Sequence, residues 1–128
     1  MRKLKIIAYS ALILMAGSVV AGQVSIDEDY MQCMDDRQKS LTSNLSLKNA
    51  QAAKQDVKEL ALMFSDVEIY YAQKGNADDA VTWSKESKVL AMAIEKYVAS
   101  NDFDTAAQAS VTLAKTCKTC HRTYKKDA

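Results

Sequence analysis

The segment that follows Ser25 contains a stripe of regularly spaced apolar residues. After Ser25, apolar side chains recur at spacings of three, four and seven residues, which places them on one side of a helix. Ser25 with Glu28 three residues later forms a capping-box pattern, and Val24 precedes it, so we expect this helix to begin there. Residues 42–49 are rich in Ser, Asn and Thr and mark its end. The apolar positions of its inner face are Ile26, Tyr30, Met34, Leu41 and Leu45.

Two further helices are expected next. Asn49 can cap the first of them, which is predicted over residues 50–74 and ends at Gly75. The second begins at the segment 76–79, whose carboxylates complement the helix dipole, and it ends at residues 100–102. The predicted buried positions of the first are Ala53, Val57, Leu60, Phe64, Val67 and Tyr71. Those of the second are Val81, Trp83, Leu90, Ile94, Tyr97 and Val98.

A fourth helix, capped by Asp102, completes the pattern. The chain has no proline, three glycines and many good helix formers, and nothing in it alternates as a strand would. Short links make successive helices antiparallel neighbours, so the sequence predicts an all-α fold, an up-down-up-down antiparallel four-helix bundle. The inward positions of the fourth helix are Phe103, Ala106, Ala107, Ser110, Leu113, Ala114, Cys117, His121 and Tyr124.

Residues 1–22 have the features of a secretory signal peptide. Three basic residues lie within the first five, and the apolar run of residues 6–20 leads to two small residues. A retained membrane anchor is the alternative, but a run of about 15 residues is shorter than the roughly 20 of a spanning helix. We therefore expect cleavage, which leaves one domain, residues 23–128, that does not span a membrane. Its 14 basic and 16 acidic residues give no reason to expect nucleic-acid binding.

The chemistry of the chain is concentrated in the segment C-K-T-C-H, formed by Cys117, Cys120 and His121. Positions i, i+3 and i+4 share one face of a helix. Both thiols can therefore bond to the two vinyl groups of one porphyrin while the imidazole reaches its iron. The signal peptide agrees with this interpretation, because such attachment belongs to exported proteins. We expect one covalently bound haem c with His121 as the proximal iron ligand.

Three other interpretations of the motif are weaker. A structural zinc site needs four ligands, but His121 is the only histidine, and the third cysteine, Cys33, lies far away in the sequence. A thioredoxin-like redox pair lies at a helix N-terminus after a strand, whereas here a helical pattern leads straight into the motif. A plain disulfide between Cys117 and Cys120 gives the histidine no role. It would also leave a mature chain of about 106 residues with a small core.

The motif lies within the last dozen residues, on the fourth predicted helix, and is followed by Tyr124 and Lys125. The chain also contains Y-M-Q-C-M-D at residues 30–35 and F-S-D-V-E-I-Y-Y at residues 64–71. In this order the segments resemble the class II cytochromes c, the cytochrome c′ family. The resemblance implies a four-helix bundle in the periplasm with the haem between helices near one end. It adds Tyr124 and Lys125 to the candidate haem-binding residues.

The second axial position of the iron decides which function the resemblance implies. Family members with a methionine from the first helix are low-spin electron carriers. Those with a bulky apolar residue there keep a five-coordinate iron that binds small gases. Met34, on the inner stripe, is the preferred ligand here and Met31 the second choice, although most helical methionines only fill the core.

A competing alignment uses the segment D-R-Q-K-S-L. It resembles the first helix of the five-coordinate members and places Arg37 near a haem propionate and Leu41 over the iron. The protein would then bind nitric oxide or carbon monoxide. An ordinary solvated position is the alternative for Arg37.

Aromatic residues at helical spacing either pack against a porphyrin or only fill the core. The candidates here are Phe64, Tyr71 and Trp83. Cys33 is expected to be a buried small side chain, with an intermolecular link as the alternative.

Basic residues crowd the fourth predicted helix around the motif. They form either a solvated face or a surface that steers an acidic redox partner to the haem edge. We expect a periplasmic electron carrier rather than an enzyme, with the five-coordinate gas binder as the alternative. The oligomeric state is open, and a homodimer is one option. The basic residues are Lys115, Lys118, Arg122, Lys125 and Lys126.

Overall fold

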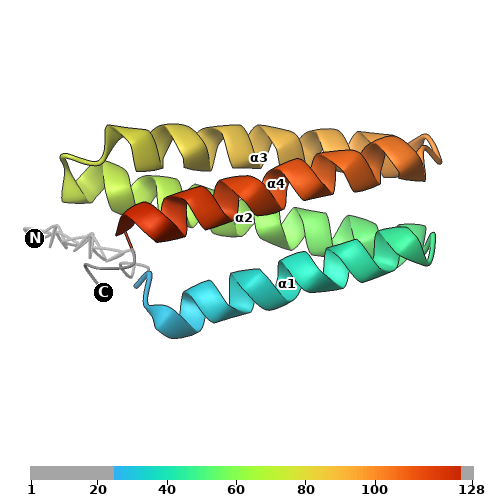
Figure 1. Ribbon diagram of the computed structural model, residues 1–128, viewed down its shortest axis with the longest axis horizontal. Helices are drawn as coiled ribbons and strands as arrows, with labels where there is room; N and C mark the ends of the chain where they lie inside the picture. Colours follow the sequence, from blue (N-terminus) through green and yellow to red (C-terminus); the bar gives the residue numbers. More distant parts are fainter. Residues whose placement is uncertain (1–24, 125–128) are drawn as a thin grey trace, which may run out of the picture.

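Four helices account for most of residues 25–124, which are the residues that the computed structural model describes (Figure 1). Successive helices run in opposite directions, so the predicted up-down-up-down bundle is confirmed. The interface of α2 with α3 is the most extensive of the bundle, and that of α1 with α4 is the least. The helices are α1 (Glu28–Ser46), α2 (Ala50–Lys74), α3 (Asp78–Ala99) and α4 (Phe103–Tyr124).

The ends of α2 and α4 follow the sequence prediction. Asn49 and Asp102 each accept a hydrogen bond from the backbone N–H three residues later, at 3.3 and 3.1 Å. Gly75, just after α2, has a φ of 75°, which glycine adopts at no steric cost. Local sequence therefore determines where α2 begins and ends and where α4 begins.

The start of α1 differs from the prediction. Its N-cap is Asp27, whose carboxylate accepts from the backbone N–H of Tyr30 at 2.9 Å, and not Ser25. With the cap at Asp27, Glu28 and Asp29 fall in the first turn, where negative charge complements the helix dipole. The expected staple residue, Val24, and the expected signal peptide, residues 1–22, lie outside the described residues.

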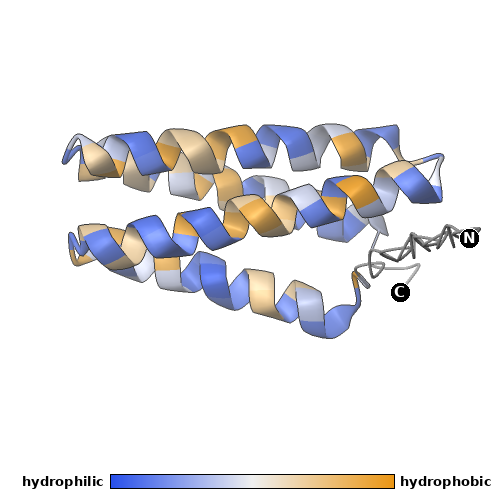
Figure 2. Cartoon of the chain, turned by 180° about the vertical axis from the view of Figure 1, so that it is seen from behind, coloured by the Kyte–Doolittle hydropathy of each residue, from blue (hydrophilic) through white to orange (hydrophobic). Residues whose placement is uncertain are grey.

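The core contains the whole predicted stripe of α2, from Ala53 to Tyr71. On α4 the prediction is wrong for Ala107, which is exposed. On α3 it is wrong for four of the six predicted positions, which are only half-buried: Val81, Trp83, Leu90 and Tyr97. Small side chains fill the buried face of α3 instead and allow the neighbouring helices to approach closely. Figure 2 shows the resulting alternation of hydrophobic and hydrophilic bands along the helices. The buried residues of α3 are Ala80, Ser84, Ser87, Ala91, Ile94 and Val98.

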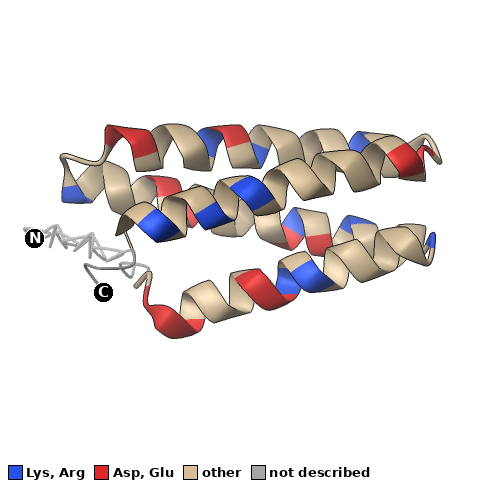
Figure 3. Ribbon diagram, in the orientation of Figure 1, with Lys and Arg blue, Asp and Glu red and all other residues tan. Residues whose placement is uncertain are grey.

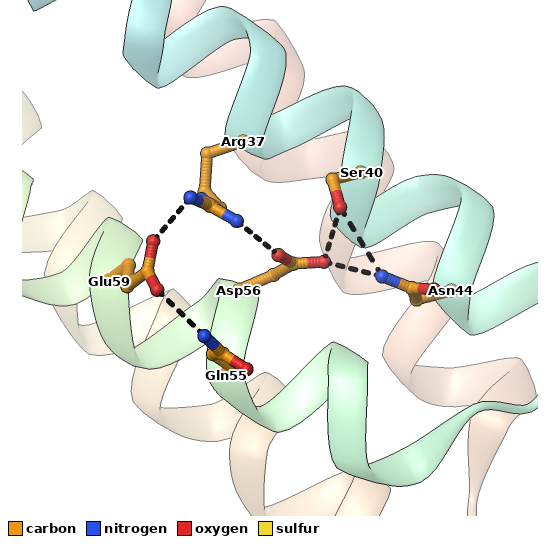
Figure 4. A network of polar contacts seen from close by, with 6 residues as sticks. All are labelled: Arg37, Ser40, Asn44, Gln55, Asp56 and Glu59. Atoms are coloured by element: carbon orange, nitrogen blue, oxygen red, sulfur yellow. Dashed lines mark hydrogen bonds and ion pairs between the residues drawn. The ribbon is translucent and has the colours of Figure 1, made fainter.

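A buried carboxylate joins α1 to α2 (Figure 4). Asp56 of α2 is 3% exposed and accepts from Arg37 at 3.0 Å, from Ser40 at 2.8 Å and from Asn44 at 2.7 Å. Arg37 also pairs with Glu59 at 2.6 Å. The hydrogen bond to Asp56 raises the pKa of Arg37 above its ordinary value. All three donors lie on α1, so this single side chain fixes the helix to its neighbour.

We expect Asp56→Ala to lower the free energy of unfolding by about 2–3 kcal/mol, because it removes a buried acceptor from three donors. Glu59→Ala removes the more exposed ion pair of Arg37 and an exposed hydrogen bond from Gln55, and it should cost less than about 0.5 kcal/mol. Urea unfolding followed by circular dichroism measures both. Equal losses in the two variants would contradict the role given to Asp56.

Candidate functional site

A pocket of about 110 Å³ lies among the four helices, at the end of the bundle where α1 begins and α4 ends (Figure 1). In this view α1 and α2 lie close together at the opposite end and diverge toward this one. Sulfur and nitrogen side chains line it together with apolar walls, while two exposed charged residues mark its edge. The first set is Met31, Met34, Cys117, Cys120 and His121. The apolar walls include Phe64, Val67, Trp83 and Ala114, and the charged residues are Asp35 and Lys118.

The last turns of α4 bring the three residues of the C-K-T-C-H motif to this pocket. Cys117, Cys120 and His121 are all half-buried and all line it. Neither cysteine forms a disulfide. Helical spacing therefore places two free thiols and one imidazole on the same wall.

Burial raises the pKa of both motif thiols to about 11. Negative charge adds to this, from Cys120 and Asp35 in the case of Cys117, and from Asp79 in the case of Cys120. Catalytic and redox-active thiol pairs have the opposite property, a pKa lowered by positive charge or a helix N-terminus. The pair at the end of α4 is therefore uncharged at neutral pH and unlike a disulfide oxidoreductase.

Two methionines of α1 line the pocket. Met34 is 8% exposed, whereas Met31, on the preceding turn, is half-buried. Both thioethers thus belong to the same pocket as His121. Met34 is also part of the hydrophobic core.

The candidate aromatic residues divide into two groups. Phe64 and Trp83 line the pocket, but Tyr71 and Tyr124 do not. The rings of Tyr71 and Tyr124 pack against each other, with centroids 4.9 Å apart. Tyr124 also donates a hydrogen bond to Asp79, which raises the pKa of its phenol to about 12. Lys125, the neighbouring candidate, lies outside the described residues, as does Lys126.

The residues of the competing alignment lie outside the pocket. Arg37 is held between Asp56 and Glu59 on the α2 side of α1. Leu41 is fully buried in the core and does not line the pocket. The structure therefore does not bring these two side chains together with His121.

The expected burial of Cys33 is wrong, because this side chain is exposed. One residue corresponds to a rotation of about 100° around a helix, so the neighbour of the inward-facing Met34 points away from the core. The small, moderately apolar side chain of cysteine suggested burial. The position of Cys33 outside the apolar stripe of α1 indicated exposure.

The sequence pattern did not indicate three buried polar residues of the pocket. Gln38, Ser84 and Ser87 are buried and line it. Gln38 occupies an inward position between Met34 and Leu41. A polar residue within an apolar stripe is a pattern from which its place in the pocket could have been predicted. Small polar residues on α3 gave no such sign.

No family model, curated protein or solved structure matches this chain. Within residues 25–124, no helix is long and apolar enough to cross a membrane. No three His, Cys, Asp or Glu side chains of these residues are grouped as a metal-ion site. The functional interpretation therefore depends on the donor set of the pocket.

We expect the exposed Cys33 of haem-free protein to react with iodoacetamide at pH 8 at least about ten times faster than the motif thiols. With a pKa of about 11, only about one motif thiol in a thousand is ionised at this pH, and the thiolate is the nucleophile. Raising the pH to 10 should speed alkylation of Cys117 and Cys120 roughly 100-fold, since their ionised fraction grows tenfold per pH unit. Peptide mass spectrometry assigns the sites. Faster reaction at the motif would indicate an activated thiol pair.

Proposed function

We propose that this protein is a periplasmic mono-haem c-type cytochrome that carries electrons and is not an enzyme. The observation that carries the proposal is the convergence of Cys117, Cys120, His121 and Met34 on one pocket. Two thiols, an imidazole and a thioether are the donor set of a covalently attached, Met/His-ligated haem. Export through residues 1–22 belongs to the same proposal.

The residues of the pocket suit this cofactor chemically. Cys117 and Cys120 would hold the porphyrin through thioether bonds, which form at free thiols such as these. Phe64, Val67 and Trp83 would exclude water from its faces. The pocket has walls on both α1 and α4, whose interface is the least extensive of the bundle.

The cofactor supplies one-electron exchange, and the protein supplies binding, orientation and electrostatics. His121 would hold the iron from α4 and Met34 would hold it from α1. If His121 and Met34 both hold the iron, no position would remain for a substrate, which is why an electron carrier fits better than an enzyme. Methionine ligation also raises the reduction potential.

The alternative is a five-coordinate cytochrome c′ that binds nitric oxide or carbon monoxide. It needs an apolar residue over the iron in place of a ligand. Leu41, its candidate, is 0% exposed in the core and does not line the pocket, whereas Met34 does. The electron carrier is therefore favoured.

A basic stripe on α4 supports docking of an acidic redox partner. Lys115, Lys118 and Arg122 are exposed and form no ion pair with other described residues. Figure 3 shows blue bands along the end of α4 and red ones at the start of α1. Positive charge beside the motif would increase the rate of encounter with a negatively charged protein at low salt.

The mature protein should carry one covalently bound haem when it is produced in a host with the haem-attachment machinery. Intact mass spectrometry should show the added haem after acid and organic extraction. The double variant Cys117→Ser, Cys120→Ser should lose it, while Cys33→Ser should keep it because Cys33 lies outside the pocket. Haem-free or zinc-loaded wild-type protein would overturn the proposal.

Met34→Ala should convert a low-spin ferric protein into a high-spin one. The wild type should show the weak near-infrared band of sulfur-to-iron charge transfer, and its ferrous form should bind carbon monoxide poorly. Met34→Ala should abolish the band and admit carbon monoxide, whereas Met31→Ala should change neither. The reverse result would move the ligand to Met31, and a wild-type protein that is already high-spin would favour the gas binder.

A further inference from the structure

Gln38 connects α1 to α4 beside the pocket. Its side-chain amide donates to the carbonyl oxygen of Ser110 at 3.1 Å and to the hydroxyl of Ser110 at 3.0 Å. The two residues are 7% and 2% exposed. Among residues 25–124, no other side-chain hydrogen bond or ion pair joins these two helices. We call this pair the Gln38–Ser110 clasp.

The orientation of the amide follows from its partner. A backbone carbonyl can only accept, so the nitrogen of Gln38 must face Ser110 and the oxygen must point elsewhere. That oxygen is buried and has no partner among the described residues. A buried acceptor without a donor destabilises the fold, and an apolar side chain would fill the same position without this cost. Packing alone therefore does not account for glutamine here.

The position of the clasp relates it to both proposed iron ligands. Gln38 lies one turn after Met34, on the same face of α1, and both residues line the pocket. Ser110 lies about three turns before His121 on α4. The clasp thus sets the spacing of the two helices at the inner end of the pocket, where their interface is the least extensive of the bundle.

Toward the start of α1, the remaining polar contact leads to a different helix. The hydroxyl of Tyr30 donates to Asp66 of α2 at 2.8 Å, which restrains α1 against α2 but not against α4. Gln38 is therefore the nearest polar restraint on the distance between Met34 and the wall that carries His121.

We propose that the Gln38–Ser110 clasp is a positioning device that holds α1 close enough to α4 for Met34 to complete the coordination of the iron. This inference depends on the proposed haem site. Gln38 acts through Met34 and does not itself contact the iron. Without the clasp, α1 moves away from α4, Met34 leaves the iron for part of the time, and an external ligand can enter.

The test is a double-mutant cycle on the haem-loaded protein, with carbon monoxide affinity of the ferrous form and the near-infrared band of the ferric form as readouts. Gln38→Leu should weaken the band and raise carbon monoxide affinity at least about tenfold. In a Met34→Ala background, the same substitution should leave the affinity unchanged, because the residue through which it acts is gone. An equal increase in both backgrounds, or no increase in either, overturns the inference.

Two control variants separate positioning from general destabilisation. Ser110→Ala keeps the carbonyl acceptor of the clasp, so its effect on the band should be much smaller than that of Gln38→Leu. Leu45→Ala removes a buried side chain elsewhere on α1; it should lower the stability to urea but preserve the band. Loss of the band in Leu45→Ala would show that any weakening of α1 suffices and would overturn the specific role of Gln38.

The spectrum of the wild-type protein distinguishes this failure from that of the proposed function. A low-spin wild type with an unresponsive Gln38→Leu variant rejects the clasp and leaves the electron carrier intact. A high-spin wild type rejects methionine ligation, and the clasp with it.

Discussion

The attachment of α1 by polar contacts is the constraint on which the candidate site depends. Of the four helices, α1 contributes only Met34, Leu41 and Leu45 as buried apolar side chains. Tyr30 and Met31 pack against the core while only partly buried, and the other connections of α1 are hydrogen bonds and ion pairs. Asp56 of α2 accepts hydrogen bonds from three side chains in the middle and later turns of α1. A buried carboxylate that loses its partners is strongly destabilising, so this part of α1 cannot leave α2 without a large loss of stability.

The two halves of α1 therefore differ. The half that contains Ser40 and Asn44 is fixed to α2 by the buried Asp56, and Leu41 and Leu45 fill the core beside it. The half that contains Met31 and Met34 faces the pocket and packs on the core through Tyr30, Met31 and Met34. Its polar contacts are the hydrogen bonds of Tyr30 to α2 and of Gln38 to α4. The distance between α1 and α4 at the pocket therefore depends on this packing and on the contact of Gln38.

Much of the fold follows from local features of the sequence, and the prediction from them was good. Helical periodicity identified the α2 stripe, and Asn49, Gly75 and Asp102 marked helix ends where the structure has them. The cap of α1 was misplaced by two residues because Ser25 and Asp27 both offer an acceptor, and only the folded turn decides between them. The small buried face of α3 was missed because hydropathy favours Trp83 over Ser84, whereas close helix packing favours the smaller side chain.

The site was predictable where its residues are neighbours on one helix and not where it depends on contacts between helices. Cys117, Cys120 and His121 share a face through their spacing alone. The separation of Arg37 from the pocket follows from its ion pairs with Asp56 and Glu59, partners about 20 residues away that no local pattern reveals. The hydrogen bond of Gln38 to Ser110 likewise joins residues 72 positions apart.

Attachment and coordination place different demands on the bundle. Thioether bonds at Cys117 and Cys120, together with His121, would fix the cofactor to α4 alone, since all three residues belong to that helix. Attachment to one helix does not require α1 to be in place. Coordination by Met34 would require it, because Met34 belongs to α1. In such an arrangement α4 determines whether the cofactor is bound, while the position of α1 determines whether its iron is closed to external ligands. An electron carrier and a gas binder can thus share one bundle and one attachment motif and differ in the residue that the first helix presents and in the contacts that hold this helix.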